Sequence, residues 1–178
     1  MGTFKTTAKE CAFMAVFVAL LIASQFVLSA IPGVELVTIL FITYSCAMGS
    51  KRGMLCATAF TLLRQFIFGA LPTVLILYLI YYNLLTFTFG LIGKKLKLKL
   101  KNLIVVVIIA CAFTAFFTLL DDIITPIYNG YSAKATKLYF YASLPVMASQ
   151  VICTAISSVC LFVPFYKVFK SVKKPLEY

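Results

Sequence analysis

Residues 10–30, ECAFMAVFVALLIASQFVLSA, carry no charged side chain after Glu10. A helix needs about 20 consecutive apolar residues to cross the hydrocarbon core of a bilayer. The stretch therefore predicts a membrane-spanning helix. Lys5 and Lys9 precede it, as in a signal peptide, but the apolar core of a signal peptide has only about 7–15 residues. We therefore expect this helix to be retained in the mature protein.

Five further apolar segments follow, separated by Gly, Pro and charged residues. The predicted spans are approximately residues 10–30, 35–49, 54–68, 72–92, 103–125 and 138–165. We expect the fifth span to stop at Pro126 and a polar loop over residues 129–137 to precede the sixth. Six spans with short loops use nearly all 178 residues, so we predict one domain, residues 1–178. The fold class is all-α, an integral membrane bundle of six transmembrane helices.

The composition agrees with this class, because 63% of the residues are hydrophobic and 12% are charged, against about 25% charged in soluble domains. The net charge of +11 does not indicate a nucleic-acid partner, since the basic residues stand in short runs between apolar stretches rather than on a soluble face. The chain has no His, which excludes imidazole acid–base chemistry and His-ligated metals. The six cysteines all fall in apolar segments without a CxxC pair, and they are expected to be small apolar helix residues.

The basic residues also predict the orientation of the chain. With the N-terminus in the cytoplasm, thirteen of the 16 Lys and Arg residues fall on the inner side, two in an outer loop (Lys134 and Lys137), and Arg64 within a span. This bias follows the positive-inside rule and predicts that both termini are cytoplasmic. The expected location is the cell membrane, as a multi-pass protein. The inner residues are Lys5, Lys9, Lys51, Arg52, Lys94, Lys95, Lys97, Lys99, Lys101, Lys167, Lys170, Lys173 and Lys174. The run over residues 94–101 is read as a topology signal, with anionic lipid binding as the alternative.

Four ionisable residues are predicted to lie in the outer half of the bundle: Glu35, Arg64, Asp121 and Asp122. A charge at the centre of a membrane helix costs about 2.5–3.5 kcal/mol on insertion scales, so embedded charges usually have a function. They would line an outward-facing polar site for a ligand. The alternative is a structural ion pair of Arg64 with Glu35 or with one of the aspartates.

Four uncharged residues extend this candidate substrate-binding set: Tyr78, Asn83, Tyr128 and Gln150. Tyrosine rings can stack on a planar ligand and hydrogen-bond to it. The alternative for most tyrosines, including Tyr139 and Tyr141 near the outer loop, is the aromatic belt at the membrane interface.

Ala15, Ala19 and Ala23 share one face of the first predicted helix, because residues four apart in sequence are neighbours on a helix surface. A row of small side chains lets another helix approach closely. The neighbour is either a helix of this bundle or a partner protein that docks on the cytoplasmic half of the helix.

Catalytic motifs are absent: the sequence has no GxxxxGK[ST] phosphate loop and no GxSxG elbow. Asp121 and Asp122 are adjacent, so on a helix they point in different directions, and no second acidic cluster accompanies them for a metal. We expect no catalytic residue, no metal and no cofactor, and we keep an intramembrane enzyme acting through the two aspartates as a minor alternative.

The whole chain resembles the substrate-specific S component of energy-coupling factor (ECF) transporters. The resemblance rests on the size, the six predicted spans, the alanine stripe, and residues 31–38, IPGVELVT, which look like the first outer loop and second helix of the vitamin-type members. It departs from several members in having no Trp to hold a ligand.

The resemblance implies a prokaryotic membrane subunit that captures a vitamin or related micronutrient at an outward-facing site. It implies docking on a transmembrane coupling subunit that is joined to two ATP-hydrolysing subunits. Ala15, Ala19 and Ala23 would face the coupling subunit, and Glu35, Asp121, Asp122, Tyr128 and Gln150 would be site candidates. Cobalamin, pyridoxine-like compounds, queuosine precursors and other heterocycles all remain open as ligands. The alternative function is a standalone secondary transporter or a structural membrane subunit.

Overall fold

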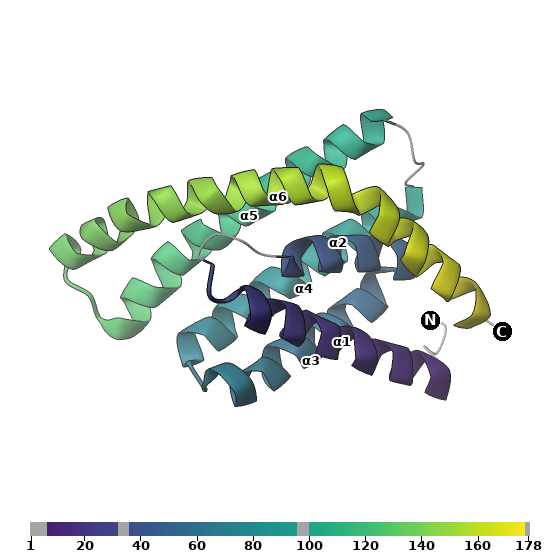
Figure 1. Ribbon diagram of the computed structural model, residues 1–178. Helices are drawn as coiled ribbons and strands as arrows, with labels where there is room; N and C mark the ends of the chain where they lie inside the picture. The colour runs from purple at the N-terminus through teal and green to yellow at the C-terminus, as the bar shows by residue number, and fades with distance from the viewer. Residues whose placement is uncertain (1–6, 32–35, 96–99, 177–178) are drawn as a thin grey trace.

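The computed structural model describes residues 7–31, 36–95 and 100–176, and every regular element in these ranges is a helix. Figure 1 shows the helices packed into one elongated bundle, with the start of α1 and the end of α6 at the same end. The helices are α1 (Ala8–Leu28), α2 (Val37–Met48), α3 (Ser50–Phe68), α4 (Pro72–Lys95), α5 (Leu100–Asn129) and α6 (Ala133–Leu176).

Four helices are long and apolar enough to cross a membrane, namely α1, α4, α5 and α6. The two remaining helices fall short for different reasons. α2 has 12 residues, which at 1.5 Å per residue is about 18 Å of helix. α3 has 19 residues but contains Lys51, Arg52 and Arg64. The described part of the chain is therefore an apolar helical bundle of the kind found in membranes.

The first helix begins with a capping box. The Thr7 hydroxyl accepts a hydrogen bond from the Glu10 backbone N–H, and the Glu10 carboxylate accepts one from the Thr7 N–H. Such reciprocal bonds satisfy backbone donors that a helix start leaves free. Glu10 also forms an ion pair with Arg52 of α3, which joins the two helices at the end of the bundle where α1 begins.

A single residue, Gly49, separates α2 from α3. Its φ of 95° is accessible to glycine without the steric strain that a Cβ would cause. All 12 residues of α2 are buried, because α3, α4 and α6 pack around it. We predicted a span over 54–68 preceded by a basic loop, and the helix in fact begins at Ser50, so Lys51 and Arg52 are helical.

Small residues let α4 approach this junction closely. A Cβ added to Gly90 would collide with the backbone of Ser50, and one added to Gly93 would collide with the backbone of Cys46. The Ser50 hydroxyl donates to the Phe87 carbonyl of α4 at 3.1 Å, and the Cys46 thiol donates to the Phe89 carbonyl at 3.3 Å. The core beside this contact is aromatic: Phe17 stacks on Tyr44 with ring centroids 4.0 Å apart, and Phe41 meets Phe60 edge to face.

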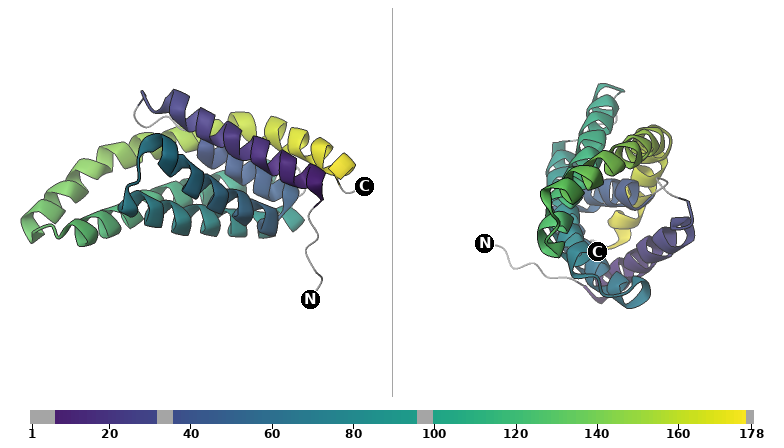
Figure 2. Two further views of the ribbon diagram at one scale, coloured as in Figure 1. Left: turned by 90° about the horizontal axis from the view of Figure 1, so that it is seen from below. Right: turned by 90° about the vertical axis from the view of Figure 1, so that its left-hand side faces the viewer.

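The hairpin of α5 and α6 differs from the prediction. The fifth helix does not stop at Pro126 but continues to Asn129, and Gly130, with φ 63°, ends it. The predicted loop over 129–137 is much shorter, because α6 begins at Ala133, and α6 runs to Leu176 rather than to 165. Figure 2 shows the hairpin extending past the other helices at the end opposite the start of α1.

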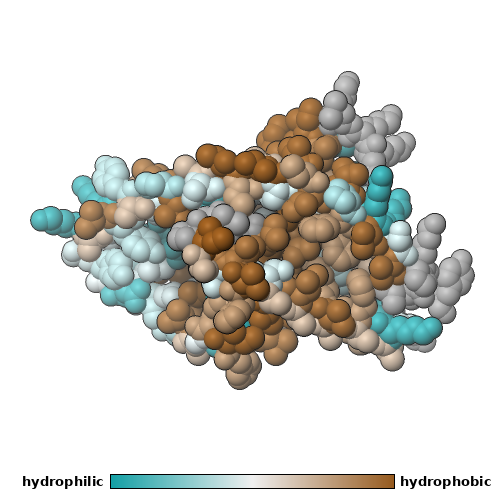
Figure 3. Space-filling view, in the orientation of Figure 1, coloured by the Kyte–Doolittle hydropathy of each residue, from teal (hydrophilic) through white to brown (hydrophobic). Residues whose placement is uncertain are grey.

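The surface of the bundle is apolar around its middle. In Figure 3, brown hydrophobic residues cover the central part of the visible face, and paler polar residues gather towards the tip of the hairpin. Many large apolar side chains are exposed, among them Phe66 and Ile127, at 87% and 75%. Exposure on this scale is expected of a surface that contacts lipid rather than water. All six cysteines lie in the described residues, and none of them forms a disulfide bond.

Candidate functional site: a polar cavity between two helices

A row of polar residues runs along the contact between α5 and α6. Thr114, Thr118 and Asp121 are spaced four and three residues apart, so they lie on one face of α5. The facing row on α6 includes Ser143 and Gln150. The Thr118 hydroxyl donates to Gln150 Oε1 at 3.3 Å, and Thr114 Oγ1 lies 2.9 Å from Thr154 Oγ1. Polar groups in apolar surroundings thus find partners across the helix pair.

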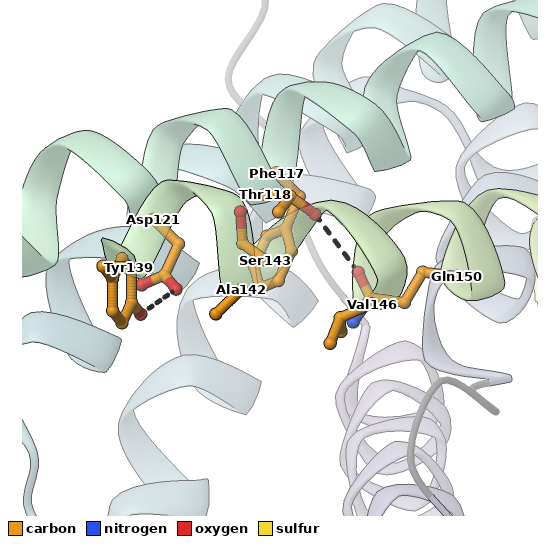
Figure 4. A pocket seen from close by; sticks show the side chains of 8 residues that line it. All are labelled: Phe117, Thr118, Asp121, Tyr139, Ala142, Ser143, Val146 and Gln150. Carbon is orange, nitrogen blue, oxygen red and sulfur yellow. Dashed lines mark hydrogen bonds between the residues drawn. The ribbon is translucent and has the colours of Figure 1, made fainter. Parts of the chain in front are cut away.

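This polar row opens into a cavity of about 250 Å³. Figure 4 shows the side chains that line it, with hydrogen bonds from Tyr139 to Asp121 and from Thr118 to Gln150. The lining residues are Phe117, Thr118 and Asp121 of α5, and Tyr139, Ala142, Ser143, Val146 and Gln150 of α6. The cavity therefore combines one carboxylate, three hydroxyls and an amide with an apolar wall that includes an aromatic ring.

Both aspartates receive hydrogen bonds from hydroxyl groups. Asp121 Oδ2 accepts from the Tyr139 hydroxyl at 2.7 Å, and Asp121 Oδ1 accepts from Thr125 at 2.6 Å. Asp122 Oδ2 accepts from Ser143 at 2.7 Å. Asp122 is 8% exposed, and its Oδ1 is buried without a hydrogen-bond partner among the described residues. The site is therefore rich in acceptors and suits a ligand that presents N–H or O–H donors.

The acidic pair belongs to no larger cluster of metal-ligating side chains in the part of the chain that the structure describes. No group of three or more His, Cys, Asp or Glu side chains lies close enough there to hold an ion. The two adjacent carboxylates point to different hydroxyls of α6, Tyr139 and Ser143, as expected for neighbouring residues on a helix.

A second polar cluster joins α1, α3 and α4. Arg64 Nε donates to Gln25 Oε1 at 3.0 Å, and Gln25 Nε2 donates to the Tyr78 hydroxyl at 2.9 Å. Arg64 Cζ lies 4.5 Å from the centroid of the Tyr78 ring and 4.7 Å from that of Phe68. Arg64 is only 7% exposed. Its charge is therefore stabilised mainly by the Gln25 amide and by the two aromatic rings.

The alternative of a structural ion pair between Arg64 and an aspartate is not seen among the described residues, where the ion pair formed is that of Arg52 with Glu10, and Asp121 and Asp122 accept hydrogen bonds from hydroxyls. The other predicted partner, Glu35, lies outside the described residues.

Tyr78 connects this cluster to the cavity. Its ring packs edge to face on Phe117, a cavity residue, with centroids 5.7 Å apart. The same ring lies 4.5 Å from Arg64 Cζ, so Arg64 Cζ and the Phe117 ring centroid are at most about 10 Å apart. Four predicted site residues are therefore in or beside one region: Asp121 and Gln150 line the cavity, and Asp122 and Tyr78 contact lining residues.

Two predicted site residues lie elsewhere. The Asn83 side chain meets Thr58 of α3 at 3.3 Å and donates to the Leu79 carbonyl of its own helix. Tyr128 is 55% exposed near the end of α5 and does not line the cavity.

The sequence analysis missed Gln25, Ser143 and Thr118, and it did not include Tyr139 among the candidate site residues. The spacing of Tyr139, Ser143, Val146 and Gln150 by four, three and four residues is a detectable helical stripe. Gln25 was detectable as the one amide inside the first apolar stretch.

The alanine stripe lies on the outside of the bundle. Ala15, Ala19 and Ala23 are exposed, whereas Phe17 and Leu21 of the same helix point into the core. Among the described residues these alanines are not buried against another helix, which was one of the two expectations, although Ala15 borders a groove between α1 and α3.

No protein-family model, curated protein or solved structure matches this chain.

Proposed function

We propose that this chain is the substrate-binding membrane subunit of an ECF-type importer, which captures a vitamin or related micronutrient from outside the cell. ATP would be hydrolysed by two partner subunits, and a transmembrane coupling subunit would connect them to this chain. The chain itself would perform no catalysis. The observation that carries the proposal is the cavity between α5 and α6, whose mostly apolar wall is interrupted by polar groups of Asp121, Tyr139 and Gln150.

The proposed arrangement has six crossings and both termini in the cytoplasm of a prokaryotic cell. Its support is the distribution of basic residues. Lys9 of α1, Lys94 and Lys95 of α4, and Lys170 of α6 lie near the helix ends that gather at one end of the bundle, where cytoplasmic loops of membrane proteins carry their positive charge. The cavity is nearer the opposite end, where α5 turns into α6. In this orientation it would be open to the outside.

The chemistry of the cavity suits capture without reaction. Phe117 supplies an aromatic wall, and Asp121, Tyr139 and Gln150 supply polar groups that fix the orientation of a small ligand. A volume of about 250 Å³ accommodates a ligand of heterocycle size. A larger micronutrient would place only one part of its structure in the cavity.

The test is ligand retention by the purified full chain, without partner subunits. The chain in detergent is equilibrated with a mixture of water-soluble vitamins and their precursors, and retained compounds are identified by mass spectrometry. We expect one compound to be retained. Tyr139→Phe removes the hydroxyl that bonds Asp121 and should weaken retention about fivefold, the effect of one hydrogen bond.

Tyr141→Phe is the matched control, because Tyr141 is 67% exposed on the same helix and does not line the cavity. Its retention should be unchanged. If the purified chain retains nothing, or takes up solute in vesicles on an ion gradient alone, the proposal fails. The second result would favour a secondary transporter.

A further inference from the structure

Arg64 has a guanidinium group that the described residues only partly satisfy. A guanidinium carries five N–H donors. The Nε–H is bonded to Gln25, and the described contacts of the group otherwise consist of the Phe68 and Tyr78 rings. Its terminal nitrogens donate no hydrogen bond to a described residue. Arg64 is only 7% exposed, so little of the residue is in contact with water.

The positive charge of Arg64 is also uncompensated within the described residues. Three carboxylates are described. Glu10 is paired with Arg52, and Asp121 and Asp122 accept hydrogen bonds from hydroxyls. An embedded charge without a counter-ion is costly, and aromatic rings supply only part of the compensation.

The donors that remain for a counter-ion are on the terminal nitrogens of Arg64. Phe68 and Tyr78 lie against the guanidinium and Gln25 occupies Nε, so the terminal nitrogens present the remaining donors. Two parallel N–H groups of this kind match a carboxylate or a phosphate in bidentate geometry. The Tyr78 ring, which touches both Arg64 and Phe117, adjoins the cavity.

We infer that the ligand carries an anionic group, a carboxylate or a phosphate, which Arg64 binds, while its N–H or O–H donors face Asp121 in the cavity. This inference rests on the proposed function. It narrows the ligand to compounds that carry an acid at one end and hydrogen-bond donors at the other, and that are long enough to reach from Arg64 past Tyr78 into the cavity. Neutral compounds of the same shape would bind poorly.

The experiment passes yeast extract over the immobilised full chain in three forms: untreated, with its carboxylic acids converted to methyl esters, and treated with phosphatase. We expect a compound to be retained from untreated extract and lost from one of the treated extracts. Loss after esterification identifies a carboxylate, and loss after phosphatase identifies a phosphate. Arg64→Gln should weaken retention at least about tenfold, as expected for charge-assisted hydrogen bonds.

Two variants separate recognition from folding. Arg64→Lys keeps the charge but not the paired donors, and it should retain the acid more weakly than the native chain and better than Arg64→Gln. Lys51→Gln removes a charge from the opposite end of the same helix and should leave retention unchanged. Thermal unfolding in detergent is measured for each variant.

Retention of a compound that survives both treatments and binds equally to Arg64→Gln would overturn the inference and leave the proposed function standing. If the native chain retains no compound at all, both the inference and the proposed function fail. A structural pair with Glu35 is the remaining outcome: Arg64→Gln and Glu35→Gln would then lower stability non-additively without altering the preference for acids, which also overturns the inference.

Discussion

Glu10 and Arg52 connect α1 to α3 through an ion pair whose side chains are 5% and 19% exposed. Removing one partner of a buried pair leaves the other charge without compensation, at a cost of about 3–5 kcal/mol. We expect Arg52→Gln to lower the free energy of unfolding by an amount near the lower end of that range. Adding Glu10→Gln to Arg52→Gln should cost little more, because the pair is already broken.

Unfolding in a denaturing detergent, measured for both single variants and the double variant, tests this pair. Lys9→Gln serves as the control, since Lys9 is an exposed neighbour of Glu10 in α1. Glu10 also belongs to the capping box with Thr7, so Arg52→Gln is the cleaner of the two single changes. Fully additive effects would mean that the two charges do not interact.

Individual residues show what a sequence can and cannot predict about the candidate site. Asp121, Asp122 and Gln150 were predictable because a polar side chain inside an apolar segment is conspicuous. The hydrogen-bond donors to the two aspartates, Tyr139 and Ser143, were not predictable in this way. Both are common residue types at a membrane interface, and they acquire these contacts only when α6 packs on α5. Arg64 was predicted to be important, but its amide partner, Gln25, lies 39 residues away in sequence.

At the scale of helices, the proposal places the docking surface for the coupling subunit on the exposed alanine face of α1. Ala15, Ala19 and Ala23 form a smooth strip, and Ala15 borders an apolar groove of about 340 Å³ between α1 and α3. If the proposed coupling subunit packs there, Ala19→Trp should abolish its co-purification with this chain. Ligand retention should persist, because the strip and the cavity are on different helices.

Ile108→Trp is a matched control, since Ile108 is 62% exposed on α5 and does not line the groove. It adds the same bulk to another outward-facing position and should leave co-purification intact. Equal co-purification of the Ala19→Trp and native chains would exclude this face of α1 as the docking surface.

The existence of six helices was predictable, whereas several of their ends were not. Apolar length is a strong signal, because a chain in lipid must satisfy its backbone groups within helices. Pro126 was expected to end α5, but proline is tolerated in membrane helices where neighbouring groups satisfy the freed carbonyl. The polar residues after Ala133 were expected to form a loop, yet they continue α6 because the Tyr139 and Ser143 contacts extend the helix pair beyond its apolar part.

At the scale of the whole molecule, the proposed orientation can be measured directly. The six native cysteines are first replaced by alanine, and single cysteines are placed at Ser132, in the turn between α5 and α6, and at Lys95, at the end of α4. On intact cells, a membrane-impermeant maleimide should label position 132 and not position 95. Both should be labelled after permeabilisation.

The reversed pattern, with position 95 labelled on intact cells, would place the cavity on the cytoplasmic side and would contradict uptake from outside. Ser132 and Lys95 are both exposed in the structure, so a difference in labelling reports the side of the membrane and not burial in the bundle.

The complete enclosure of α2 has a consequence for how sequences related to this one would vary. Outward-facing positions such as Ile127 of α5 can exchange one apolar residue for another with little effect on packing. Each side chain of α2 is instead confined by neighbours on all sides. At such positions the gain or loss of even one methylene group lowers stability. Among close homologues the slowest-changing segment is therefore expected to be α2, and invariance there would report packing rather than contact with a ligand.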